Sequence, residues 1–98
     1  MPENKSHKTT SNRIAGKYNA EYNSNKGVDI VTPRIAIEVE TENTISSGMQ
    51  QLQGHKKSAY IAGTNQDAVN KALERTKGTT IGVMDNQGNI VRRSTRKK

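Results

Sequence analysis

Cysteine is absent from this chain of 98 residues, which excludes disulfide bridges and thiolate metal sites. Phe and Trp are absent as well, and the aromatic residues are three Tyr. No long apolar run predicts a signal peptide or a membrane-spanning helix. A cysteine-free chain of this kind suits a reducing compartment, so we expect a soluble cytoplasmic protein with no membrane partner.

Large aliphatic residues are also scarce. Leu, Ile and Val total 16, whereas ordered domains usually hold more than roughly 20% of such core formers. Fifteen of the 16 lie between Val28 and Val91, and the remaining one is Ile14. This distribution predicts one small domain with a thin core. A second subunit would cover apolar surface that so short a chain leaves exposed, so we expect a homodimer.

Negative charge is in the minority, because 16 Lys and Arg residues outnumber nine acids. The net charge of +7 and the isoelectric point near 9.9 favour a polyanionic partner. We expect this partner to be nucleic acid, in particular DNA. A basic protein that binds no polyanion is the alternative.

Basic and polar residues concentrate toward the two ends of the chain, which predicts three regions. Residues 1–16 are expected to form a basic flexible arm, residues 17–93 the core domain, and residues 94–98 a basic tail. Positive side chains near the end of the chain are suited to nucleic-acid phosphates. The residues expected to make these contacts are Arg92, Arg93, Arg96, Lys97 and Lys98.

The stretch VDIVTPRIAIEVET, residues 28–41, contains two β-branched runs separated by Pro-Arg. This arrangement predicts a β-hairpin. A loop of two or four residues places Ile30 opposite Ile37 and Asp29 opposite Glu38, whereas a three-residue loop would shift the register by one. Because side chains alternate along a strand, Glu38 and Glu40 share one face with Asp29. The aliphatic residues fill the other face: Ile30, Ile35, Ile37 and Val39.

The rest of the chain predicts alternating strands and helices. After Thr41 a helix is expected whose apolar stripe is Ile45, Met49 and Leu52, with Thr44 as its N-cap. The other expected elements are a weak strand over 17–23, a strand in KSAYIAG (57–63), a helix in NQDAVNKALERTKG (65–78), and a strand, turn and strand in TTIGVMDNQGNIVRR (79–93). This order predicts an α/β fold with a mixed β-sheet flanked by helices.

Three carboxylates on one face of a hairpin repel one another, at a cost on the order of 4 kcal/mol for a pair about 4 Å apart. They can stay solvated, they can share protons, or they can bind a divalent cation through their oxygens. Mg²⁺, with Mn²⁺ as a substitute, would keep positions for water and a phosphate oxygen. Asp29, Glu38 and Glu40 are therefore candidate metal ligands and catalytic residues for phosphodiester hydrolysis.

The segments GVDI, which contains Asp29, and IAIEVET, which contains Glu38, resemble the motif of the PD-(D/E)xK nuclease superfamily. That superfamily includes restriction endonucleases and archaeal Holliday-junction resolvases. In its pattern an Asp opens one strand, Glu-x-Lys lies on the next, and a helix and a further strand follow. The resemblance covers roughly residues 18–63. It implies a restriction-endonuclease-like fold and a Mg²⁺-dependent DNA endonuclease, structure-specific if it resolves junctions or nicks.

Glu40 stands where the family pattern has its lysine. Glu-x-Glu motifs look like those of some active restriction enzymes, and Lys56 or Lys57 could take the lysine's place. The alternatives are a catalytically inactive nucleic-acid-binding protein of the same fold, and a basic assembly or interaction protein without a metal. His7 and His55 have no His or Cys partner at ligand spacing, so we expect both at the surface.

Overall fold

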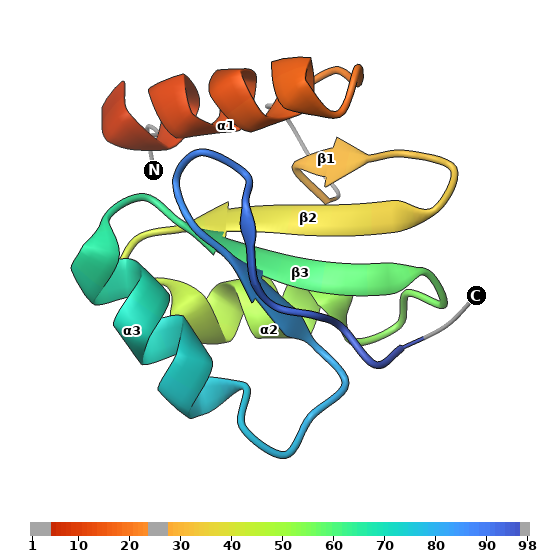
Figure 1. Cartoon of the computed structure of the whole chain (residues 1–98), viewed down its shortest axis with the longest axis vertical. Coiled ribbons are helices and arrows are strands. Elements are labelled where there is room, and N and C mark those ends of the chain that lie inside the picture. Colours follow the sequence, from red (N-terminus) through yellow and green to blue (C-terminus); the bar gives the residue numbers. More distant parts are fainter. Residues whose placement is uncertain (1–4, 24–27, 97–98) are drawn as a thin grey trace.

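The computed structural model describes residues 5–23 and 28–96. In chain order the elements are α1 (Lys5–Lys17), β1 (Ile30–Val31), β2 (Ile35–Glu40), α2 (Ile45–Leu52), β3 (Ser58–Gly63), α3 (Gln66–Arg75), β4 (Gly82–Met84) and β5 (Ile90–Arg92). The strands form one sheet in the order β1-β2-β3-β4-β5 (Figure 1). The inner strands β2, β3 and β4 run parallel, whereas β1 and β5 are antiparallel edge strands.

Helices cover both faces of this sheet. Helix α1 packs on one face, where Ile14 and Ala15 join a buried cluster with Ile37 and Val39 of β2. Helices α2 and α3 cover the other face, in a second cluster that includes Ile61 of β3. In Figure 1, α1 lies above the sheet and the other two helices lie below it. The predicted α/β class, a mixed sheet flanked by helices in one small domain, is confirmed.

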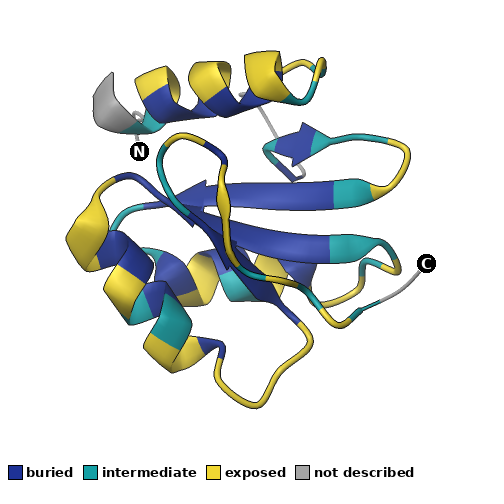
Figure 2. Ribbon diagram, viewed as in Figure 1, coloured by how far each residue is buried: buried dark blue, intermediate teal, exposed yellow. Residues whose placement is uncertain are grey.

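The central strands are buried along most of their length (Figure 2). Parallel strands with helices on both faces have no solvated side, so β3 is apolar on both faces, whereas β2 alternates because Glu38 and Glu40 share one of its faces. Small residues let the helices approach closely. A Cβ at Gly63 would lie 2.6 Å from the backbone nitrogen of Val69, so α3 packs directly on the end of β3.

The predicted hairpin register is confirmed. Ile30 pairs with Ile37, and Thr32 N–H donates to the Ile35 carbonyl at 2.8 Å across the loop of Pro33 and Arg34. The Thr32 hydroxyl closes this turn, because it accepts from Ile35 N–H at 2.9 Å. The loop therefore has two residues, and the register places Asp29 across from Glu38.

The flexible arm expected over residues 1–16 is helical in its described part, and the weak strand expected over 17–23 is reduced to one antiparallel bridge, between Tyr22 and Ile30. Helix α1 spans Lys5–Lys17, and residues 1–4 lie outside the described residues. The core domain therefore begins before residue 17. Most of the residues on the buried face of α1 are small or polar. The sequence therefore shows little hydrophobic periodicity there, and the helix was not predicted. The residues of this face with an exposed fraction of 3% or less are Thr10, Ser11, Ile14 and Ala15.

The segment expected as a basic tail from residue 94 is packed as far as it is described. Thr95 N–H donates to the Thr80 carbonyl at 3.0 Å, and the Ser94 hydroxyl donates to the same carbonyl at 2.7 Å. The Arg96 guanidinium donates to the Leu52 and His55 carbonyls at 2.6 and 2.9 Å. Residues 94–96 are thus part of the domain.

The helices expected after Thr41 and in residues 65–78 are confirmed as α2 and α3. In α2, Ile45 and Leu52 are buried and Met49 packs against them. Helix α3 begins at an Asn65 cap, whose side-chain oxygen accepts from Ala68 N–H at 2.8 Å. No helix in the described part of the chain is long and apolar enough to cross a membrane.

Replacement of Ile14 by Ala tests the packing of α1. Ile14 is fully buried, so we expect the free energy of unfolding to fall by about 2–5 kcal/mol. Thr9→Ala on the exposed side of the same helix is the control, with a change within about 0.5 kcal/mol. Urea unfolding measures both. Equal stabilities for the two variants would contradict this packing and would favour the basic flexible arm expected from the sequence.

Candidate metal centre

Asp29, Glu38 and Glu40 converge at one point of the fold. One carboxylate oxygen from each lies within 4.8 Å of those from the other two. Glu38 and Glu40 come from β2 and are 4% and 7% exposed. The Asp29 side chain, just before β1, is 13% exposed. The sequence-based expectation that these side chains share a face is confirmed, but that face lies beneath α2 instead of being open to water.

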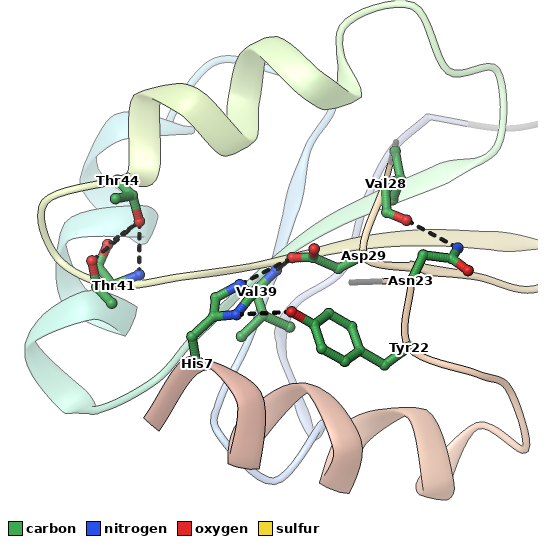
Figure 3. A network of polar contacts seen from close by, with 8 residues as sticks. All are labelled: His7, Tyr22, Asn23, Val28, Asp29, Val39, Thr41 and Thr44. Carbon is green, nitrogen blue, oxygen red and sulfur yellow. Dashed lines mark hydrogen bonds and ion pairs between the residues drawn. The ribbon is translucent and has the colours of Figure 1, made fainter. Parts of the chain in front are cut away.

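The Asp29 carboxylate accepts a backbone hydrogen bond from the end of β2 that no neighbouring strand accepts. Because β1 begins at Ile30, it does not reach the last residues of β2. Val39 N–H instead donates to Oδ2 of Asp29 at 2.9 Å (Figure 3). A backbone donor at the sheet edge thereby holds the carboxylate next to Glu38 and Glu40.

A histidine from α1 reaches the same carboxylate. Nε2 of His7 lies 3.3 Å from Oδ2 of Asp29, and Nδ1 of His7 lies 3.2 Å from the Tyr22 hydroxyl (Figure 3). The rings of His7 and Tyr22 also meet edge to face, with centroids 5.8 Å apart. The expectation that His7 is an isolated surface residue is therefore wrong. No local pattern in the sequence joins α1 to the hairpin, so sequence reasoning missed this contact.

Gly48 of α2 makes room for Glu40. A Cβ at this position would lie 2.6 Å from Cγ and 2.7 Å from Oε2 of Glu40, and 2.8 Å from Cδ1 of Ile61. Glycine within a helix costs about 1 kcal/mol relative to alanine. The close approach of α2 to Glu40 is the reason for glycine here, and the sequence alone gives no sign of it.

Thr44 lies between β2 and α2, as expected, but its side chain makes no capping hydrogen bond to the helix. Its hydroxyl oxygen accepts from Thr41 N–H at 2.9 Å and so closes the turn after β2. The Thr44 side chain also hydrogen-bonds Glu40, which acts to lower the pKa of that carboxyl. This turn fixes the end of the strand that carries both glutamates.

Burial and mutual repulsion keep protons on the cluster. Burial, followed by the charge of Asp29 and the proximity of Glu40, raises the pKa of Glu38 to about 10. Burial also raises the pKa of Glu40, against the opposing hydrogen bonds of Thr44 and Glu38. At neutral pH and without a cation, the cluster is therefore protonated in part.

One oxygen of the cluster is left without a protein partner. Oε2 of Glu38 is fully buried and makes no hydrogen bond to any described residue. Buried polar atoms are almost always paired, and a lone buried carboxylate oxygen is costly. A divalent cation that prefers oxygen ligands would satisfy it and would neutralise the neighbouring carboxylates. The residues present thus fit a Mg²⁺ or Mn²⁺ ion.

The lysines considered as substitutes lie elsewhere. Lys57 precedes β3 and donates to the Thr32 carbonyl at 3.0 Å, at the hairpin loop. Glu40 instead pairs with Gly63 at the far end of β3. Lys56 is exposed in the connection before β3. Neither lysine takes the motif position occupied by Glu40.

The residues expected to bind nucleic acid are placed unequally. The Arg92 guanidinium donates to the Leu73 and Ile81 carbonyls and to the Thr76 hydroxyl. Together with the carbonyl contacts of Arg96, this leaves Arg93 as the exposed arginine of the predicted set. Lys97 and Lys98 lie outside the described residues.

No protein-family model, curated protein or solved structure matches this chain.

Stability in the absence of metal should depend on pH through Glu38. Its folded pKa of about 10 lies above the ordinary value of 4.5, so between these values the folded protein holds more protons than the unfolded chain. The free energy of unfolding then falls as pH rises, by about 1.4 kcal/mol per pH unit for this group. Urea unfolding in EDTA, from mildly acidic to mildly alkaline pH, measures the slope.

Glu38→Gln removes the titrating group and keeps the shape of the side chain. We expect this variant to gain stability over the parent protein as pH rises, with a flatter profile. Parallel profiles would mean that Glu38 is already ionised in the folded state.

A methyl group at position 48 should disturb the cluster. We expect Gly48→Ala to lower the free energy of unfolding by about 1–3 kcal/mol, because overpacking against Glu40 and Ile61 outweighs the gain in helix propensity. Gly54→Ala is the matched control, since a Cβ there meets nothing within 4 Å. Thermal unfolding of both variants decides the matter. An unchanged or raised melting temperature for Gly48→Ala would contradict the close contact.

Proposed function

We propose that this protein is a Mg²⁺-dependent endonuclease that hydrolyses phosphodiester bonds in DNA, with Mn²⁺ as a substitute. The observation that carries the proposal is the convergence of Asp29, Glu38 and Glu40, with the buried oxygen of Glu38 left for a cation. Three acids gathered in one buried site repel one another when they are ionised, and a divalent cation would offset that repulsion.

The three carboxylates would hold the ion. A bound divalent ion supplies Lewis acidity toward a phosphate oxygen and lowers the pKa of a water molecule. The backbone N–H of Val39 fixes the orientation of Asp29, and His7 contacts the same oxygen. Asp29 is the most exposed of the three ligands, so a phosphate would approach the site at the β1 edge.

The positive charge of the chain supports a nucleic-acid substrate. Basic side chains at the surface neutralise phosphates and release counterions. Those exposed among the described residues include Lys8 and Arg13 on α1, Arg34 on the hairpin loop, and Arg93. A cytoplasmic homodimer with two such sites would suit a branched junction or the two strands of a duplex.

A second function is favoured by Glu40 itself. A carboxylate replaces the lysine of the family motif, and Lys57 is held at the opposite end of the strand pair. A protein that binds nucleic acid without cutting it is the competing proposal. A basic assembly protein that takes up no metal is the third.

Cleavage assays separate these proposals. We expect purified protein with Mg²⁺ or Mn²⁺ to cut duplex, nicked, single-stranded or four-way-junction DNA. Glu38→Gln should lose activity by at least about 100-fold, the scale on which a preorganised electrostatic group contributes. Glu42→Gln is the control, because Glu42 is an exposed acid just beyond β2 and should leave the rate unchanged. A protein that binds all four DNAs and cuts none would establish the non-catalytic alternative.

Metal binding has its own readout. Ligands that bind the folded state alone stabilise it, by about 2.7 kcal/mol at 100 times the dissociation constant. We expect Mg²⁺ to raise the melting temperature of the parent protein and of Glu42→Gln, but not of Glu38→Gln. Binding should also release protons, because the pKa of Glu38 is about 10 without metal. A melting temperature insensitive to Mg²⁺ and Mn²⁺ would favour the assembly protein.

A further inference from the structure

A groove separate from the acidic cluster lies between α2, the end of α3 and the C-terminal segment. Its volume is about 420 Å³, within the range of small-molecule sites. It shares no residue with the cluster, which lies where α2 meets the sheet at Gly48. The groove is lined by Ser46, Met49, Gln50, Gln53, Arg75, Thr79, Ile81 and Arg96.

Charge in the groove has one sign. The lining residues include Arg75 and Arg96 and no carboxylate. The Arg96 guanidinium is held by three hydrogen bonds, which it donates to the Leu52 and His55 carbonyls and to the Thr80 hydroxyl. Its Nη2 makes no hydrogen bond to a described residue. Arg75 is exposed in the last turn of α3, with no hydrogen bond or ion pair to the described residues. Two guanidinium groups with no carboxylate nearby favour the binding of an anion. The planar guanidinium group can donate two parallel hydrogen bonds to a phosphate.

Arg75 has a simpler role as well. A cation in the last turn of a helix interacts favourably with the helix dipole. This role explains a positive residue at position 75, but it does not explain the neutral polar side chains that face the same groove.

The remaining lining residues suit a planar ring. Met49 and Ile81 supply apolar surface, and thioethers contact aromatic rings favourably. Gln50 and Gln53 line the same space, and their side-chain amides make no hydrogen bond to the described residues. A glutamine amide can donate and accept together on one adenine edge. Phosphate-binding cations, apolar surface and free amides in one groove are the three contacts that a nucleotide needs.

We propose that this groove binds one nucleotide unit, with the phosphate on Arg75 and Arg96, the base against Met49 and Ile81, and the base edge on Gln50 or Gln53. The unit is either a free nucleoside monophosphate or an unpaired nucleotide of a single strand, since both present the same chemistry. This site does not depend on the proposed hydrolysis, because it contains none of the three carboxylates.

Nuclear magnetic resonance titrations test the site in EDTA, where no cleavage takes place. The probes are AMP, inorganic phosphate and a short single-stranded oligodeoxyadenylate. We expect AMP to shift the signals of Met49, Gln50, Gln53 and Arg75 in a saturable way, and phosphate to bind at least about tenfold more weakly because it has no base. Shifts of the same signals by the oligonucleotide and not by AMP would support the site with a strand as its source.

Variants show whether the groove or general charge is responsible. Arg75→Gln should weaken binding at least about tenfold, the scale of a charged hydrogen bond. Lys17→Gln, which removes one positive charge from the exposed end of α1, should leave binding unchanged. The proposal is overturned if phosphate binds as tightly as AMP, if Lys17→Gln weakens binding equally, or if no probe shifts these signals. If the parent protein binds AMP but cuts no DNA, the nuclease proposal is contradicted and the nucleotide site stands.

Discussion

Burial of three carboxylates at one point is the constraint on which the arrangement of this small domain depends. The acids meet where α2 crosses the end of β2, and removal from water together with mutual repulsion raises the pKa of Glu38 to about 10. Hydrophobic burial elsewhere must offset that cost, in a chain that holds 16 large aliphatic residues. A fold this short retains such a cluster only if neighbouring groups stabilise it, and three contacts do so here. Asp29 accepts a backbone hydrogen bond, Thr44 closes the adjoining turn, and Gly48 leaves space for Glu40.

The two sides of the sheet contribute differently to this site. The face under α2 and α3 carries the carboxylates, and the face under α1 carries Ile37 and Val39, so alternation along one strand separates polar from apolar contacts. Helix α1 nevertheless reaches the cluster at the sheet edge through His7. The short edge strand β1 makes this possible, because it begins at Ile30, opposite Ile37, and leaves the last residues of β2 uncovered.

The hairpin and its acidic residues could be predicted from sequence because two local rules determine them. A two-residue loop fixes the register, and the period of two along a strand then fixes which side chains share a face. Helix α1 escaped prediction because its buried face is mostly Thr10, Ser11 and Ala15, which give almost no hydrophobic periodicity. His7 and Gly48 escaped for a different reason. Their importance comes from contacts between segments distant in the chain, and no local pattern reports such contacts.

Arg92 and Arg96 were expected to face a partner, and the structure turns both inward. Arg92 donates to a carbonyl of α3 and Arg96 to the last carbonyl of α2. Two guanidiniums from the final described stretch thus satisfy carbonyls in the last turns of both helices on that face. During synthesis on a ribosome, α2 and α3 would lack these hydrogen bonds until Arg92 and Arg96 had left the exit tunnel. The order in which the chain is made therefore imposes a delay on the half of the fold that holds α2 over the acids.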